Sequence, residues 1–144
     1  MSGKSFILVT IQFSSFIYFG ITGNLFSEGF LFLFQLAAIF IGLWAIVVLK
    51  IGNFNIQPEV KSTAVFIKKG PYKIIRNPMY LCILLFFGIA VNHSYSTIRL
   101  TIFLILTTSL LLKIFSEEKF LKEKFSNSYN VYKQQTYRLI PYVF

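Results

Sequence analysis

A group of polar side chains lies where the sequence enters a hydrophobic segment. Residues 70–80 read Gly-Pro-Tyr-Lys-Ile-Ile-Arg-Asn-Pro-Met-Tyr, so an arginine, an amide and two tyrosines stand at the start of an apolar run. A second polar group, Glu117-Glu118, follows the last apolar run. Polar and charged groups at the edge of a bilayer are costly unless they have partners. Together the two groups indicate a membrane-embedded enzyme with a ligand site rather than a simple anchor.

The first group also has a simpler interpretation. Tyr72, Arg76 and Tyr80 are residue types that anchor helix ends at the membrane interface. Asn77 followed by Pro78 is an ordinary helix start, because Asn is a good N-cap and Pro is tolerated in the first turn. It is the combination of these residues within eleven positions that favours a binding site.

The second group has a simpler interpretation as well. Lys113 and Glu117 are four residues apart, so on a helix they share a face and form a solvated ion pair. Two adjacent carboxylates at a membrane exit, however, repel each other and the anionic lipid headgroups. A cationic ligand would relieve that repulsion.

Composition places the chain in a membrane. The 144 residues are 56% hydrophobic, the mean hydropathy is +0.68, and only 13% are charged, against about 25% in soluble domains. The net charge of +9 comes from blocks that flank apolar runs, which fits anionic headgroups better than nucleic acid. The single cysteine, Cys82, excludes an intrachain disulfide, and the single histidine, His93, makes no metal site.

Hydrophobic runs predict an all-α integral membrane protein with four transmembrane helices. A bilayer core needs about 20 apolar residues of helix, and the third run is shorter than that. The four runs cover residues 5–21, 29–49, 78–91 and 97–114.

Short connections predict that these spans form two hairpins. A C-terminal interfacial helix is expected from residue 116 to residue 126, with a break at residues 125–128. We therefore divide the chain into an N-terminal transmembrane hairpin, residues 1–50, and a core of loop, second hairpin and tail, residues 51–144. Gln12 and Gln35 lie inside the first two spans and are expected to hydrogen-bond between helices.

Charge asymmetry predicts the orientation in the membrane. Lys4, Lys50, the loop of residues 52–77 and the basic tail lie on one side of a four-span layout, whereas Arg99 lies near the other side. The positive-inside rule then places both termini and the loop in the cytoplasm. Both polar groups face the same compartment, as one shared active site requires.

The order of the motifs resembles the isoprenylcysteine carboxyl methyltransferase family over about residues 50–142. The related phospholipid N-methyltransferases look similar in the Asn-Pro-Met-Tyr and Glu-Glu elements. The residues that carry the resemblance are Gln57, Gly70-Pro71-Tyr72, Arg76-Asn77-Pro78-Met79-Tyr80, Glu117-Glu118, Leu121, Phe125, Tyr129, Tyr132 and Ile140-Pro141.

The resemblance implies S-adenosylmethionine as cofactor, held outside any Rossmann domain. Consistently, the sequence has no Gly-x-Gly-x-x-Gly motif. Glu117 would close the cofactor pocket from the tail helix. Carried over from the family, the other cofactor-binding residues would be Gln57, Ala64, Val65, Phe66, Ile67, Tyr72, Asn77, Pro78, Met79 and Tyr80.

Two departures from the carboxyl methyltransferases bear on the acceptor. Asn77 stands where most of them have His, so this position binds rather than titrates. Lys113 stands where they tend to have an Arg that orients the substrate, and Lys cannot form a bidentate contact with a carboxylate. Lys113 and Glu118 are our candidate catalytic residues, Lys113 for orienting the substrate and Glu118, or Glu117, as the base that an amine acceptor would need.

We therefore expect an S-adenosylmethionine-dependent methyltransferase that acts on a membrane lipid or lipidated acceptor. The main expectation is carboxyl methylation of an isoprenylcysteine-like substrate, for which the enzyme supplies proximity and alignment. The first alternative is N-methylation of a phospholipid amine. The second alternative is a non-enzymatic membrane protein that keeps this fold for interaction. The natural acceptor and the oligomeric state are left open by the sequence.

Overall fold

The structure, a computed structural model, describes residues 3–49 and 67–144. It is all-α in these residues, with helices α1 (Gly3–Thr22), α2 (Phe30–Leu49), α3 (Pro78–His93) and α4 (Thr97–Gln135) and a short 3-10 helix, η2 (Gly70–Lys73). Three of them, α1, α2 and α4, are long and apolar enough to cross a membrane. The chain is therefore that of a multi-pass membrane protein. Helix α3 is apolar but only 16 residues long, so a fourth span stays a prediction.

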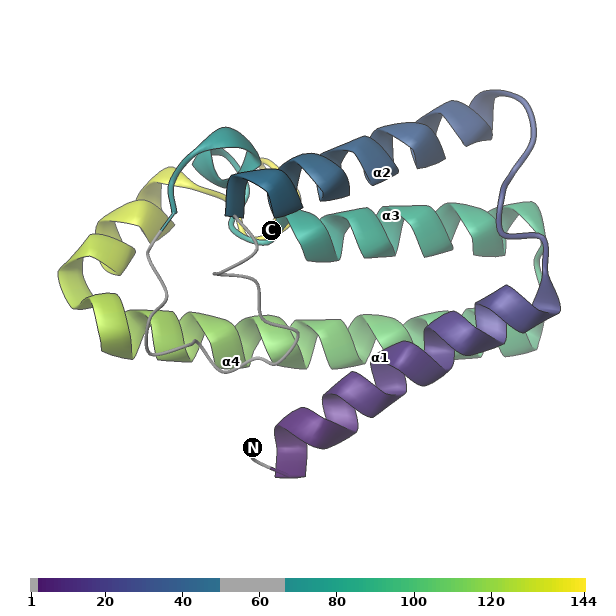
Figure 1. The fold of residues 1–144 in the computed structure, drawn as a ribbon, viewed down its shortest axis with the longest axis horizontal. Helices are drawn as coiled ribbons and strands as arrows, with labels where there is room; N and C mark the ends of the chain where they lie inside the picture. Colours follow the sequence, from purple (N-terminus) through teal and green to yellow (C-terminus); the bar gives the residue numbers. More distant parts are fainter. Residues whose placement is uncertain (1–2, 50–66) are drawn as a thin grey trace.

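The helices pair differently from the two expected hairpins. Helix α2 packs on α3 and α1 packs on α4, as Figure 1 shows, and α3 also packs on α4. The second expected pair is thus in contact, whereas α1 and α2 each pack mainly on a helix from the second half of the chain. One reason is a close approach between α2 and α3: a Cβ atom on Gly42 would lie 2.6 Å from Cys82 Sγ.

The two intramembrane glutamines form hydrogen bonds between distant segments, as predicted. Gln35 Oε1 accepts from the backbone N–H and the hydroxyl of Ser27, both at 2.8 Å. Gln35 Nε2 donates to the carbonyl of Leu25 at 2.8 Å and to that of Phe86, in α3, at 3.2 Å. Gln12 in α1 bonds to α4. These bonds explain the observed pairing, because each glutamine satisfies a polar group across the helices that pack together.

Arg99 closes the end of the bundle opposite the two polar groups. It is 5% exposed, and its guanidinium donates to Thr22 Oγ1 and to the carbonyls of Gly23, Asn24 and Ala90 at 3.1–3.4 Å. This arginine therefore joins the C-terminal end of α1, the C-terminal part of α3 and the start of α4.

Helix α4 merges two expected elements. It continues for 39 residues through the predicted interfacial helix, with non-helical φ and ψ angles of 40° and −113° at Ser126. The predicted break at residues 125–128 is therefore confirmed as a kink. Beyond α4 the chain returns to the start of α3, where Arg76 N donates to Tyr137 O at 2.8 Å and Tyr137 N donates to Ile74 O at 2.9 Å.

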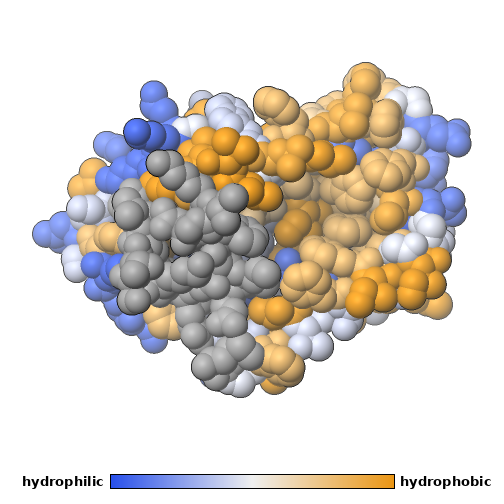
Figure 2. Space-filling view, in the orientation of Figure 1, coloured by the Kyte–Doolittle hydropathy of each residue, from blue (hydrophilic) through white to orange (hydrophobic). Residues whose placement is uncertain are grey.

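The surface is suited to lipid. Apolar side chains such as those of Ile21 and Val47 are 81% and 74% exposed. Figure 2 shows hydrophobic residues across the middle of this face and hydrophilic residues gathered towards its two ends. Apolar exposure on this scale is unfavourable in water and natural in a bilayer.

Candidate functional site

The two polar groups of the sequence meet in the structure through Tyr80 and Glu117. The Tyr80 hydroxyl, in the first turn of α3, donates a short hydrogen bond to Glu117 Oε1 on α4. Glu117 is half-buried, and burial raises its carboxyl pKa above the usual value. The charge of Glu118 also raises this pKa, whereas the Tyr80 hydrogen bond and the nearby Lys113 charge lower it without cancelling the rise. This carboxylate is the centre of the candidate site.

Lys113 lies beside this carboxylate but is enclosed by the protein. Its side chain is buried, with 1% of the residue exposed. Its Nζ donates to Gln12 Oε1 on α1 at 2.6 Å and lies 5.6 Å from the centre of the Tyr80 ring. Its charge acts on the Glu117 carboxyl, and its burial keeps it off the surface.

Glu118 is held by two arginines from separate segments. Arg76 Nε donates to Oε1 at 3.0 Å, and Arg138 donates from Nε to Oε1 at 3.1 Å and from NH2 to Oε2 at 2.9 Å. Burial acts to raise the carboxyl pKa of Glu118, but the arginine hydrogen bonds and charges outweigh it, so the pKa lies below its usual value. A carboxylate with a lowered pKa is a weak base.

The turn before α3 places Tyr72 against the tail. Gly70 adopts a φ of +56° at the start of η2, and Pro71 occupies the first turn of this 3-10 helix. Tyr72 is buried, its backbone carbonyl accepts from the Tyr132 hydroxyl at 2.5 Å, and burial raises the pKa of its phenol well above the usual value. Its ring therefore stays neutral near the Glu117 charge.

The start of α3 is built largely as predicted, with one difference. Pro78 occupies the first turn and Asn77 is the N-cap residue, but the Asn77 side chain makes no capping hydrogen bond. Its Nδ2 instead donates to the carbonyl of Arg138 at 3.0 Å. This hydrogen bond ties the start of α3 to the C-terminal segment.

Five of the predicted cofactor residues lie in or at the end of the loop before η2, and their role stays a prediction. Gln57, Ala64, Val65 and Phe66 lie outside the described residues. Ile67 is described and half-buried. Contacts around the start of α3 and the middle of α4 bring together Tyr72, Asn77, Tyr80, Lys113, Glu117 and Glu118, and Pro78 and Met79 lie between Asn77 and Tyr80 in the first turn of α3.

Sequence reasoning did not place two further residues, Gln12 and Arg138, at this site. Gln12 was expected to bond between helices, but its partner, Lys113, was not foreseen. Arg138, in the tail, was treated only as a basic residue, and it completes the shell around Glu118. The basic character of the tail was a signal, but its lysines were candidates for the same role as Arg138.

A comparison with known families assigns the larger part of the chain. The family model described as phospholipid methyltransferase matches residues 29–128, which run from the turn before α2 to just beyond the kink in α4. No curated protein matches the chain.

Proposed function

The chain belongs to the phospholipid methyltransferase family, and from this premise we propose that it transfers a methyl group from S-adenosylmethionine to the amine of a membrane phospholipid. The family match supports this alternative better than carboxyl methylation of an isoprenylcysteine-like acceptor, which the motifs suggested first. The match agrees with the coarser expectation of a membrane methyltransferase.

The observation that carries the choice of acceptor is the Tyr80–Glu117 pair. A half-buried carboxylate attracts a cationic amine and repels a carboxylate acceptor. Three cations around Glu117 and Glu118 are engaged elsewhere: Lys113 is buried against Gln12, and Arg76 and Arg138 hold Glu118. The charges of the site therefore favour an amine headgroup.

An amine acceptor also needs a base, because a lipid ammonium has no lone pair until it loses a proton. Glu117, whose pKa is raised by burial, is better suited to accept this proton than Glu118, whose pKa is lowered. We therefore assign the base to Glu117, and we assign Glu118 to positioning Arg76 and Arg138. We assign Lys113 to positioning as well, because its buried amine lies beside Tyr80 and Glu117 and not on the surface.

The residues present fit a cationic cofactor. The Glu117 carboxylate provides a counter-charge for a cation. The rings of Tyr72 and Tyr80 beside it provide aromatic faces, which also attract cations. When bound, S-adenosylmethionine supplies an electrophilic methyl group on a sulfonium centre. Tyr72, Asn77, Pro78, Met79, Tyr80 and Ile67 are the described residues that we expect to hold it.

The test uses membranes that contain the protein and S-adenosylmethionine labelled on its methyl group. We expect label in the extracted phospholipids that survives mild alkali and depends on Glu117, because an N-methyl bond resists alkali and an ester does not. Glu117→Gln should lose the label, and Glu123→Gln, on the exposed surface of α4, should keep it. Label that alkali releases would return the assignment to carboxyl methylation, and an absence of label in the unaltered protein would favour a non-enzymatic role.

We also propose that the short helix α3 completes a fourth span and that both termini face the cytoplasm, on the basis of the basic residues near α1, η2 and the tail. Local thinning of the bilayer would allow a helix of 16 residues to cross. A single cysteine introduced near either terminus of a Cys82→Ala protein should be blocked by an impermeant thiol reagent only after the membrane is opened. Labelling of one terminus in sealed cells would contradict the four-span layout.

A further inference from the structure

A groove lies between the N-terminal part of α1 and the middle of α4. Its volume is 470 Å³, within the range of about 300–1,000 Å³ that is usual for ligand pockets. Helix α1 contributes Lys4 and Leu8, and α4 contributes Leu112, Ser116 and Lys119. Helix α1 precedes residues 29–128, so the family match assigns no role to this side of the groove.

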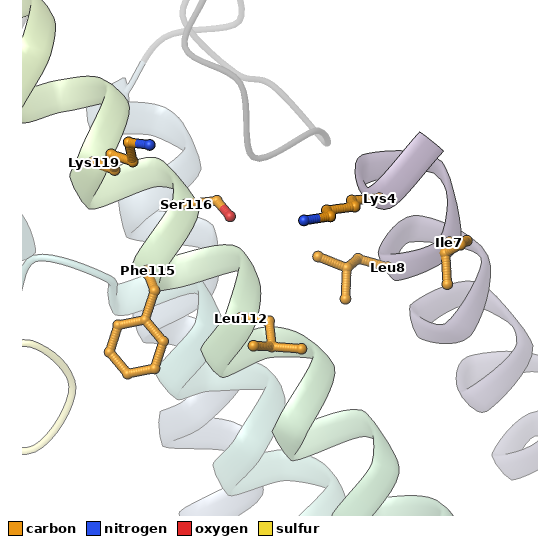
Figure 3. Close-up of a pocket in the computed structure, with 7 residues that line it drawn as sticks. All are labelled: Lys4, Ile7, Leu8, Leu112, Phe115, Ser116 and Lys119. Atoms are coloured by element: carbon orange, nitrogen blue, oxygen red, sulfur yellow. The ribbon is translucent and has the colours of Figure 1, made fainter. Parts of the chain in front are cut away.

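The groove has a polar mouth and an apolar floor. In Figure 3 the Lys4 amine points across the gap towards α4, and the Ser116 hydroxyl points back towards α1. Lys119 follows Ser116 at the outer end of the groove, and the side chains of Leu8 and Leu112 face each other deeper in it (Figure 3). This arrangement suits a ligand with a charged head and a hydrocarbon tail.

The charge at the mouth is positive and has no acidic partner within the described residues. The ion pairs found in residues 3–49 and 67–144 both involve Glu118, and Lys4 and Lys119 are exposed. Lys4 begins the first apolar helix, and Lys119 follows the last apolar run by five residues. Both amines therefore lie at the depth of lipid headgroups, where each cation attracts an anionic lipid.

We propose that this groove binds an anionic phospholipid, with the headgroup phosphate between Lys4 and Lys119 and part of an acyl chain on Leu8 and Leu112. The two lysines repel an ammonium group, so the site selects against the amine-bearing lipid that we assign to Glu117. The bound lipid is thus a second lipid, distinct from the methyl acceptor. The lipid lies between α1 and α4, near the Gln12–Lys113 hydrogen bond.

The test measures lipid retention by the full chain without any methyl transfer. Purified protein in detergent is incubated with equal amounts of phosphatidylglycerol and phosphatidylcholine of identical acyl chains, and the bound lipids are counted by native mass spectrometry. The protein should retain phosphatidylglycerol in preference to phosphatidylcholine. Two cations at a membrane surface contribute enough attraction that Lys4→Gln with Lys119→Gln should lower this retention about tenfold.

The matched control removes the same charge elsewhere. Lys73→Gln with Lys122→Gln alters two exposed lysines that do not line the groove, and this protein should retain the lipid as the unaltered protein does. If the Lys4 and Lys119 double variant does not fold, Lys119→Gln alone, on the surface of α4, should show a smaller loss in the same direction.

Three results would overturn the proposal. The first is equal retention of the two lipids by the unaltered protein, which needs no variant. The second is equal loss in the groove variant and the control variant, which would mean that net charge alone attracts the lipid. The third is displacement of the lipid by soluble glycerol phosphate at the same concentration, which would mean that the lysines bind a free phosphate.

Discussion

Gln12 Oε1 and Lys113 Nζ, which are 101 positions apart in the sequence, are joined by a hydrogen bond of 2.6 Å. The bond links α1 to α4 at the level of the candidate site, since Lys113 lies beside the Tyr80 ring. The first helix is thereby coupled to residues that belong to the matched family region, although the helix itself lies outside that region.

Replacing Gln12 by Leu should therefore affect both stability and methyl transfer. The substitution removes the acceptor that Gln12 offers to a buried ammonium, and such losses cost about 1–3 kcal/mol. Thermal unfolding of the purified protein should occur at a lower temperature, and Gln12→Glu, which keeps an acceptor oxygen, should restore most of the difference. The control is Thr10→Ala on the exposed side of α1; an equal effect of both substitutions would show that the bond has no special role.

Replacing Tyr80 by Phe should move the pH dependence of methyl transfer. Burial raises the pKa of Glu117, and the Tyr80 hydrogen bond counteracts this rise, so losing the hydroxyl raises the pKa further. Because the base has to be ionised, activity should rise with pH through the Glu117 pKa, above the usual carboxyl value of 4.5, and the rise should occur at a higher pH in Tyr80→Phe. Rates measured across the pH range for both proteins check this; an unchanged profile with a lower maximum would remove Glu117 from the role of base.

The sequence predicts the helices well because their lengths follow from bilayer thickness. The expected spans at residues 5–21 and 29–49 differ from α1 and α2 by no more than two residues at either end. The pairing of helices was predicted only in part: the contact of α3 with α4 was expected, whereas the packing of α2 on α3 and of α1 on α4 was not. Apolar runs of similar composition pack on one another with little preference. The choice depends on a few polar partners, such as Gln35 with the Phe86 carbonyl, which hydropathy does not identify.

The site was predicted in part for a similar reason. Motif order brought Tyr80 and Glu117 to attention, and the structure joins them. Glu118 was proposed as a base because the sequence shows that a carboxylate is present but does not show which residues surround it. Its pairing with Arg76 and Arg138 depends on the return of the tail to α3, a tertiary contact that no local pattern encodes.

Replacing Glu118 by Gln should release the C-terminal segment from the start of α3. Removing one partner from a buried ion pair costs about 3–5 kcal/mol, and we expect roughly 2 kcal/mol here because the Arg138 side chain is partly exposed. Limited proteolysis should cut the tail sooner than in Glu123→Gln, an exposed glutamate on the same helix. Equal rates of cleavage in the two variants would show that the ion pairs do not hold the tail.

The same carboxylate gives the tail a dependence on pH. The pKa of Glu118 is lowered in the folded protein, so its contribution to stability is fully present above the usual carboxyl pKa. That contribution is lost as the pH falls below 4.5 and through the lower folded value. Tail cleavage by an acid-stable protease should therefore accelerate on acidification in the unaltered protein, whereas Glu118→Gln should show a weaker dependence.

Replacing Gly70 by Ala should disturb the turn that places Tyr72. Gly70 has a φ of +56°, and an added Cβ atom would lie 2.7 Å from Val48 Cγ2 and 3.2 Å from Trp44 Nε1 on α2. A non-glycine residue in this backbone conformation costs about 1–3 kcal/mol, and the contact with α2 forces η2 away from its place. Both unfolding temperature and methyl transfer should fall. In Gly20→Ala, where nothing lies within 4 Å of the added atom, helix propensity favours alanine by about 0.5–1 kcal/mol, so the unfolding temperature should stay or rise. A neutral result at Gly70 would mean that the turn adapts and that Tyr72 does not depend on it.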